Sequence, residues 1–311
     1  MLFLGIDTSC YTTSLAGVSE NDIVFDERIV LQVKSGERGL RQSEAVFQHV
    51  RNMQTLIDRV SLDCGVEAVG VSKYPRPAEE SYMPVFVVGQ TVATALSAAA
   101  SAKLFYTSHQ QGHIRAALVG NERLLGGEFV AMHLSGGTTE LLLVGKRGEI
   151  ELIGGCSDLH AGQLVDRVGV LLKCPFPCGK HMETLALKAG KGAISIPSCV
   201  RGLECSLSGA ETKIQREYIG KDSGEIAYSV YDLLARTFSK LMLNAAYATG
   251  KNRFLLAGGV ASSLLLRQML NERLRKKGLE VFYSRPELAS DNAVGAALLC
   301  RDAMRHEGWY A

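Results

Sequence analysis

The sequence lacks any apolar stretch of the length that crosses a membrane. The longest candidate, near residues 92–102, is rich in alanine and is interrupted by threonine and serine, whereas a spanning helix needs about 20 consecutive apolar residues. The N-terminus turns polar at Asp7, which is too early for a secretory signal peptide. We therefore expect a cytoplasmic protein with no membrane partner.

Three further absences restrict the chemistry. The eight cysteines are scattered, and Cys174 and Cys178 do not have C-x-x-C spacing, so a zinc knuckle is not expected. A cytoplasmic chain would keep these thiols reduced. No His-Glu-x-x-His is present, which argues against a zinc peptidase. The net charge is only +2, so bulk charge does not indicate nucleic-acid binding, although a local basic patch remains compatible with it.

The composition of the chain is typical of folded proteins, and the sequence contains an internal repeat. Its 311 residues are 47% hydrophobic and 21% charged, which suits two domains with ordinary cores. Residues 2–33 predict three antiparallel strands, and helix, strand, helix and strand follow up to residue 107. The same order begins again at residue 129 and indicates an internal duplication.

The repeat predicts a domain boundary near residue 122. The first α/β domain is predicted at 1–122 and the second at 123–311. Residues 174–221 are rich in Gly, Ser and Pro and are interpreted as irregular, either an insertion or a small helical subregion. For the last helix, 291–305, we also consider packing back onto the first domain.

Each half opens with a hairpin whose turn carries small or hydroxyl residues. Ser9 lies in the first turn, and Ser135, Gly136 and Gly137 form the second. Such turns let the backbone approach a phosphate closely. Two of them in a duplicated α/β chain suggest the actin-like, ribonuclease H-like (ASKHA) fold, with two α/β domains around a nucleotide cleft. The alternative is two ordinary hairpins that use glycine for a positive φ.

Two histidines, His109 and His113, are spaced four residues apart. On a helix this spacing places both imidazoles on one face, where they can share a divalent metal. Two ligands hold a metal weakly, so a carboxylate is needed from elsewhere. Asp291 suits that role, and iron or zinc suits the resulting set. The alternatives are a plain helix start for the histidine pair and a helix N-cap for Asp291.

Two further features suit a nucleotide. Gly258 and Gly259 follow a predicted strand and precede a helix, which places helix N-terminal N–H groups beside an anion. Asp166 lies on a predicted helix, from which its carboxylate could accept ribose hydroxyls. A plain turn for the glycines and a solvated helix face for Asp166 are the competing interpretations.

Taken together, these motifs resemble the TsaD family, also called glycoprotease-like or M22 proteins, which act in tRNA threonylcarbamoyladenosine synthesis. The resemblance covers almost the whole chain and depends on the order of the motifs. The motifs that carry it are Leu4-Gly-Ile-Asp-Thr-Ser-Cys10, Ser108-His-Gln-Gln-Gly-His113, Leu134-Ser-Gly-Gly-Thr138, Ala161-Gly-Gln-Leu-Val-Asp-Arg167, Ser206-Leu-Ser-Gly209, Ala257-Gly-Gly-Val-Ala261 and Ser290-Asp-Asn292.

The resemblance implies a metal-dependent transferase that binds an adenine nucleotide. Iron or zinc would be held by His109, His113 and Asp291, and ATP, AMP or threonylcarbamoyl-AMP would lie at the Gly-rich loops. Two of the family's nucleotide-loop positions correspond to Gly179 and Ser263 in this chain. The implied reaction is threonylcarbamoyl transfer to N6 of an adenosine beside the tRNA anticodon, with the metal as Lewis acid.

The chain also departs from the family pattern. Thr12, Leu159 and Gln163 stand where the family has acidic residues, and losing a general base ordinarily costs about 10²- to 10⁴-fold in rate. We therefore interpret the chain as a divergent paralog. It would retain the reaction, transfer to another acceptor, or act as a scaffold partner of a true TsaD.

The family also implies macromolecular partners. TsaB-like or TsaE-like proteins and tRNA are the expected ones. The strongest local basic run lies on one predicted helix and is either an RNA contact or a solvated face. It consists of Arg267, Arg273, Arg275, Lys276 and Lys277.

Overall fold

The computed structural model describes residues 1–9, 11–33, 40–62, 65–77, 82–218 and 220–305. Cys10, which closes the first motif, and Cys64 lie outside the described residues. The chain divides into two compact units. Unit 1 contains Met1–Gly126, Lys146–Ile150 and the chain from Ser290 onward, and unit 2 contains Gly127–Gly145 and Glu151–Ala289.

Unit 1 is built on a five-stranded sheet in the order β3-β2-β1-β4-β5. The predicted meander is present, because β1, β2 and β3 pair antiparallel, and β4 and β5 then extend the sheet parallel to β1. The strands are β1 (Leu2–Asp7), β2 (Thr12–Val18), β3 (Ile23–Val30), β4 (Val66–Tyr74) and β5 (Lys103–Ser108).

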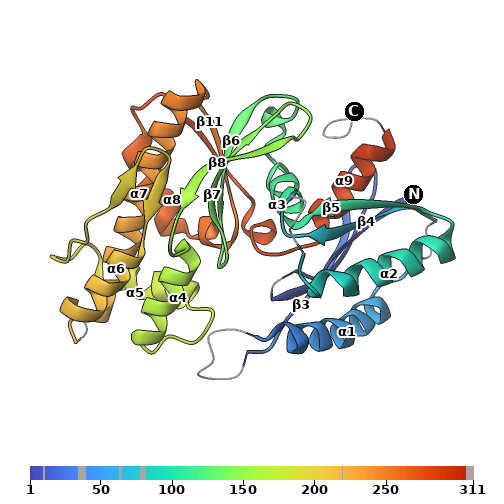
Figure 1. Cartoon of the computed structure of the whole chain (residues 1–311), viewed down its shortest axis with the longest axis horizontal. Coiled ribbons are helices and arrows are strands. Elements are labelled where there is room, and N and C mark those ends of the chain that lie inside the picture. Colours follow the sequence, from blue (N-terminus) through green and yellow to red (C-terminus); the bar gives the residue numbers. More distant parts are fainter. Residues whose placement is uncertain (10, 34–39, 63–64, 78–81, 219, 306–311) are drawn as a thin grey trace. The chain divides into compact units, whose positions relative to one another are not determined.

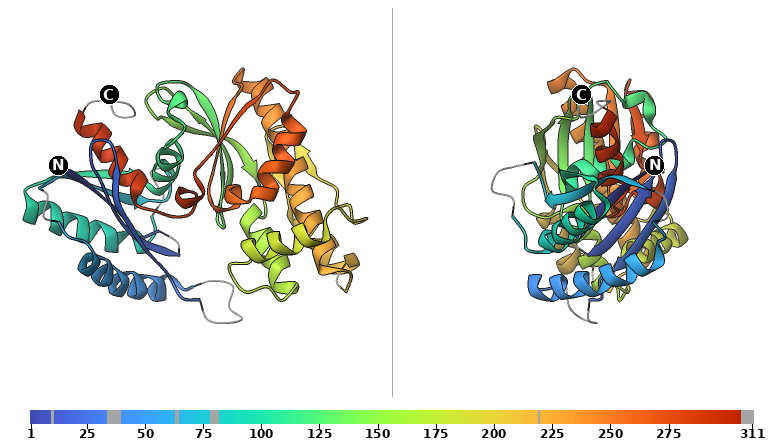
Figure 2. Two further views of the ribbon diagram at one scale, coloured as in Figure 1. Left: turned by 180° about the vertical axis from the view of Figure 1, so that it is seen from behind. Right: turned by 90° about the vertical axis from the view of Figure 1, so that its right-hand side faces the viewer.

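Helices cover both faces of this sheet (Figures 1 and 2). On one face, Leu4 and Ile6 of β1 join a core with Met53 and Leu56 of α1. On the other face, β1 and β4 carry glycines that let α9 pack directly on the sheet. The helices of unit 1 are α1 (Gln42–Arg59), α2 (Val85–Ala100), α3 (His109–Ala117) and α9 (Val294–Arg305), with the short η1 (Glu122–Leu124).

Unit 2 is built on a seven-stranded sheet in the order β12-β11-β6-β7-β8-β10-β9. β6 and β7 form the second Gly-rich hairpin, and β11 and β12 add parallel to β6. The strands are β6 (Phe129–Leu134), β7 (Thr139–Val144), β8 (Ile150–Cys156), β9 (Cys199–Arg201), β10 (Glu204–Ser206), β11 (Arg253–Ala257) and β12 (Glu280–Tyr283).

The helices of unit 2 bury one large apolar core against this sheet. The 27-residue α7 supplies much of it, including Tyr231 and Phe238. In Figure 1, α7 runs beside α5 and α8, both of which contact it. The remaining elements are α4 (Ala161–Leu171), α5 (Gly179–Ala189), α6 (Ser208–Lys213), the π-helical η2 (Ile214–Tyr218), α7 (Ser223–Thr249), η3 (Gly259–Ser262), α8 (Leu264–Leu274) and η4 (Pro286–Leu288).

The interpretation of residues 174–221 as irregular holds only in part, because the alternative of a small helical subregion describes much of the segment. It contains the 11-residue α5, the short α6 and η2, and the β9–β10 hairpin. β10 pairs parallel with β8, so the hairpin extends the sheet. The elements are short and are separated by Gly, Ser and Pro, so a periodicity of hydrophobic residues has no length over which to develop.

No helix in the described part of the chain has the length and apolar character of a membrane-spanning segment.

Candidate functional site

The histidine pair lies at the start of α3, where β5 ends. Ser108 caps the helix: its Oγ accepts a hydrogen bond from Gln111 N–H at 3.1 Å, and its own N–H donates to Gln111 Oε1 at 2.9 Å. This reciprocal capping fixes the first turn. His109 and His113 therefore lie one turn apart on the same buried face, with only 9% and 4% of each residue exposed.

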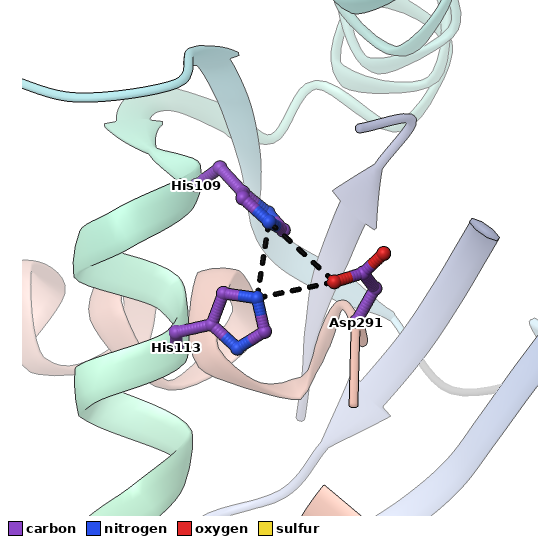
Figure 3. A group of neighbouring side chains, drawn as sticks. All are labelled: His109, His113 and Asp291. Carbon is purple, nitrogen blue, oxygen red and sulfur yellow. Dashed lines mark hydrogen bonds and ion pairs between the residues drawn. The ribbon is translucent and has the colours of Figure 1, made fainter. Parts of the chain in front are cut away.

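Asp291 completes a triad with the two histidines (Figure 3). Nε2 of His113 lies 3.0 Å from Nε2 of His109 and 3.2 Å from Oδ1 of Asp291, and His109 Nε2 lies 3.6 Å from the same oxygen. Ligand atoms about 2.0–2.1 Å from a tetrahedral zinc would be about 3.3 Å apart. The three donor atoms thus have the separations of neighbouring corners of a metal coordination shell.

Asp7 supports the triad from the end of β1. Its Oδ2 lies 2.8 Å from Nδ1 of His109 and accepts a hydrogen bond from Ser72 Oγ at 2.6 Å. Its Oδ1 accepts from Ser9 N–H at 2.8 Å. A carboxylate on the far nitrogen fixes the tautomer and orientation of a ligating histidine. Here it leaves Nε2 of His109 free to face His113 and Asp291.

Sequence reasoning missed this role of Asp7. The residue is visible in the sequence as the first polar position after the apolar stretch 2–6. Its partner lies 102 residues further along the chain, however, and only the fold brings the two together.

Burial and the charges of Asp7 and Asp291 determine the protonation of the triad. Burial lowers the pKa of His109, but the charges of Asp7 and Asp291 outweigh that and raise it to about 9. Burial and the charge on His109 lower the pKa of His113. Burial raises the pKa of Asp291, but the hydrogen bond from His113 and the histidine charges lower it overall. The site therefore favours ionised carboxylates together with one positive charge, which a metal would replace.

Close packing of α9 on α3 places Asp291 beside His109 and His113. A Cβ at Gly295 would lie 1.9 Å from the carbonyl oxygen of Gly112, so the two helices approach as closely as backbones can. Further along, Nε of Arg115 donates to Asp302 at 2.7 Å in a buried ion pair. These contacts hold the start of α9 against the first turns of α3.

Ser9, predicted to contact a nucleotide, lies next to the histidine pair of unit 1. The residue is fully buried, and its Oγ is 2.8 Å from Nδ1 of His109 and hydrogen-bonded to Asp7. In the described structure its hydroxyl thus supports the same histidine that Asp7 orients.

Unit 2 brings the predicted glycine-rich loops together. The turn at Ser135, Gly136 and Gly137 follows β6, and the N–H of Gly162 at the start of α4 donates to Ser135 O at 3.2 Å. Gly258 follows the neighbouring β11 with φ of 95°, and a Cβ there would lie 2.3 Å from Leu134 O. Two strand ends and one helix N-terminus therefore meet at this turn, where Gly136 and Gly137 are exposed.

The other predicted nucleotide residues connect helices within unit 2. Oδ1 of Asp166 accepts from Cys178 N–H at 2.8 Å, directly before α5, and burial raises the pKa of this carboxyl. Gly179 begins α5, and its carbonyl accepts from Tyr231 Oη at 3.0 Å. Ser263 caps α8 by accepting from Leu266 N–H at 3.1 Å. Gly259 begins η3.

The three positions that depart from the family pattern have structural contacts. Thr12 and Leu159 are buried, with Leu159 in the core of unit 2. Oε1 of Gln163 accepts from His160 N–H at 3.2 Å and so helps to cap α4.

Two members of the basic run are occupied by internal contacts. Arg267 donates to the carbonyls of Ala261 and Ser284, at 2.6 and 2.7 Å. Arg273 pairs with Asp232 at 2.6 Å. Arg275, Lys276 and Lys277 are exposed.

Comparison with solved structures identifies the fold class of the chain. Two α/β units, each opening with antiparallel strands that parallel strands extend, form a duplicated actin-like fold. HypF from T. kodakarensis matches 98% of this chain at a TM-score of 0.64 and 15% identity, and the chain spans 48% of HypF. The activator of the 2-hydroxyisocaproyl-CoA dehydratase from Clostridium difficile, solved with ADPNP, matches with a TM-score of 0.59 and 13% identity, covering 98% of this chain and 96% of its own. A ROK family glucokinase from Streptomyces griseus, in complex with glucose and AMPPNP, matches with a TM-score of 0.56 and 14% identity, covering 97% and 100%.

A comparison with family models assigns the chain more specifically than its fold does. The model of the TsaD family, tRNA N6-adenosine threonylcarbamoyltransferase, matches residues 31–298. The chain therefore belongs to the TsaD family, as its motifs predicted.

Proposed function

We propose that the protein transfers a threonylcarbamoyl group from threonylcarbamoyl-AMP to N6 of the adenosine beside the tRNA anticodon (adenosine 37). Family membership supports the reaction class. The observation that carries the proposal to this chain is the triad of His109, His113 and Asp291, whose donor atoms have the separations that a divalent cation requires.

In this proposal the triad holds iron or zinc, which supplies a Lewis acid for the carbamoyl group. The protein's own contribution is orientation. Asp7 and Ser9 fix the His109 ring, and the packing of Gly295 on Gly112 fixes Asp291. In unit 2, the exposed turn at Gly136 and Gly137 is the part of the chain that would lie against the phosphate of an adenine nucleotide, because neither residue has a side chain to keep a ligand away.

A transfer assay tests the proposal. Purified full-length protein is supplied with divalent metal, threonylcarbamoyl-AMP and unmodified tRNA, alone and with TsaB-like and TsaE-like proteins, which we propose as partners. The modified nucleoside is then quantified. We expect product with the natural chain and at least a 100-fold loss with His113→Ala, because an orienting Lewis acid contributes several kcal/mol. Equal product from His113→Ala would contradict the role of the triad.

A second candidate is carbamoyl transfer to a different acceptor. The observation that favours it is the burial of Thr12 and Leu159, and the capping role of Gln163, where the family has carboxylates. Metal-dependent consumption of threonylcarbamoyl-AMP without tRNA modification would support this candidate. Absence of metal binding and turnover would instead indicate a scaffold that partners a true TsaD.

A further inference from the structure

Two cysteines of unit 2 lie opposite each other on neighbouring strands. Cys156 ends β8, and Cys205 is its register partner on the parallel strand β10. The backbone fixes this pairing, because Ser157 N–H donates to Cys205 O at 3.1 Å and Gly155 N–H donates to Leu203 O at 2.9 Å. Residues in register on adjacent strands point to the same face of the sheet.

The spacing of these strands is compatible with a covalent link. Adjacent strands are about 4.8 Å apart, and disulfides join residues whose Cα atoms are about 4.4–6.8 Å apart. Both cysteines are free thiols in the structure. A bond between their sulfur atoms would therefore require side-chain rotation and little movement of the backbone.

The two thiols differ in access and in acidity. Cys156 is partly exposed, whereas only 3% of Cys205 is exposed. A hydrogen bond from Cys205, together with nearby backbone N–H groups, lowers the pKa of Cys156, and the same hydrogen bond raises the pKa of Cys205. A partly exposed, more acidic thiol beside a buried partner is the arrangement of an attacking and a resolving cysteine.

We propose that Cys156 and Cys205 form a reversible disulfide when the protein meets a low-molecular-weight disulfide. The Cys156 thiolate attacks one sulfur of the small disulfide, and one small thiolate leaves. Cys205 then loses its proton to solvent, attacks the sulfur of Cys156 and displaces the second small thiolate. Two protein thiols are thus oxidised to one disulfide, and one small disulfide is reduced to two thiols.

The bond would connect two segments that share a polar contact. Asp158, two residues after Cys156, accepts from Leu207 N–H at 2.9 Å and from Ser206 Oγ at 2.6 Å, just beyond Cys205. A disulfide would make this non-covalent connection between the end of β8 and the end of β10 covalent.

Oxidised glutathione is the probe for the test. The reduced full-length protein is incubated with it, free thiols are counted, and the linked peptides are identified by mass spectrometry without reduction. In the natural chain, two of the lost thiols should be those of Cys156 and Cys205 joined in one intramolecular bond, and dithiothreitol should restore both. Cys205→Ser should stop at one glutathione on Cys156.

Cys199→Ser is the matched control. Cys199 is exposed and pairs with Ser206, so it lies on the opposite face of the hairpin from Cys205. This variant should form the same bond as the natural chain. The proposal is overturned if the natural chain links Cys199 instead, retains a stable glutathione on Cys156, or leaves Cys156 unmodified. Circular dichroism of each variant shows whether it has folded.

Discussion

Outside the triad, Asp7 is the residue that most directly determines the orientation of a triad side chain. Its carboxylate holds the face of His109 that points away from the other two ligands, so the histidine ring has one orientation. Loss of such an outer carboxylate typically costs about 10- to 100-fold in metal affinity. We therefore expect Asp7→Asn to weaken zinc binding by about that factor while some binding remains. Competition titration with a chromogenic chelator measures this, and an unchanged affinity would show that Asp7 does not orient the ligand.

A second residue-scale prediction concerns His49 of α1. Its side chain is fully buried, and its Nδ1 lies 2.9 Å from Thr13 Oγ1. Burial lowers its pKa from 6.5 to about 4, although Asp7 and Asp291 oppose that shift. As the pH falls, the His49 imidazole therefore becomes protonated at a higher pH in the unfolded chain than in the folded chain. This histidine has little effect on stability above pH 6.5 and lowers the stability as the pH falls from 6.5 towards 4.

Denaturant unfolding of the natural chain and of His49→Gln isolates this effect, because the acidic groups are common to both. Between pH 7 and pH 5 the natural chain should lose about 2 kcal/mol more unfolding free energy than the variant. His181→Gln, at an exposed histidine of α5, is the control and should follow the natural chain. Parallel pH profiles for the natural chain and His49→Gln would refute the assignment of a neutral buried imidazole.

At the scale of elements, the crossing of α3 and α9 determines whether Asp291 reaches the histidines. A Cβ at Gly295 would overlap the backbone of Gly112, whereas a Cβ at Gly112 would meet only one atom, at 3.9 Å. Gly295→Ala should therefore cost about 1–3 kcal/mol of unfolding free energy and reduce metal binding, as overpacked sites do. Gly112→Ala, between the two ligands, should be neutral or slightly stabilising because alanine favours a helix. Equal stability and metal content in the two variants would show that this crossing does not position Asp291.

The Gly-rich turn of unit 2 allows a similar separation of structure from binding. A Cβ at Gly136 would meet nothing within 4 Å, so Gly136→Ala should leave the melting temperature of the free protein unchanged. If a phosphate approaches this backbone, the same variant should lose the stabilisation by ATP or AMP, which is about 2.7 kcal/mol at 100 times the dissociation constant. Gly65→Ala in unit 1, also at an open position, should keep it. If ATP or AMP stabilised Gly136→Ala as much as the natural chain, the turn would be excluded as the phosphate site.

The sequence allowed the elements to be predicted to very different degrees. The pattern of apolar residues over 223–249 predicts a long helix that ends at a glycine, and α7 has these bounds. The pattern over 261–277 predicts a further helix, but α8 is shorter, because Ser263 caps it and a 3₁₀ turn precedes it. Short elements within 174–221 carried no such signal.

For the whole molecule, the family and the duplicated fold were predictable because both depend on the order of motifs along the chain. The contact of Asp7 with His109 was not, and neither was the pairing of Cys156 with Cys205, because the fold joins residues far apart in the sequence. The triad is intermediate: helical spacing placed the two histidines on one face, and the family pattern supported Asp291 as the third candidate ligand.

The central claim is that His109, His113 and Asp291 bind one divalent metal. Equilibrium dialysis of the purified chain against zinc or iron, followed by elemental analysis, tests it most directly. We expect about one metal per chain, a loss of affinity in His113→Ala and Asp291→Asn that exceeds the roughly 10- to 100-fold effect of an outer carboxylate, and natural affinity in His181→Ala. A natural chain without stoichiometric metal, or ligand variants that bind as the natural chain does, would contradict it.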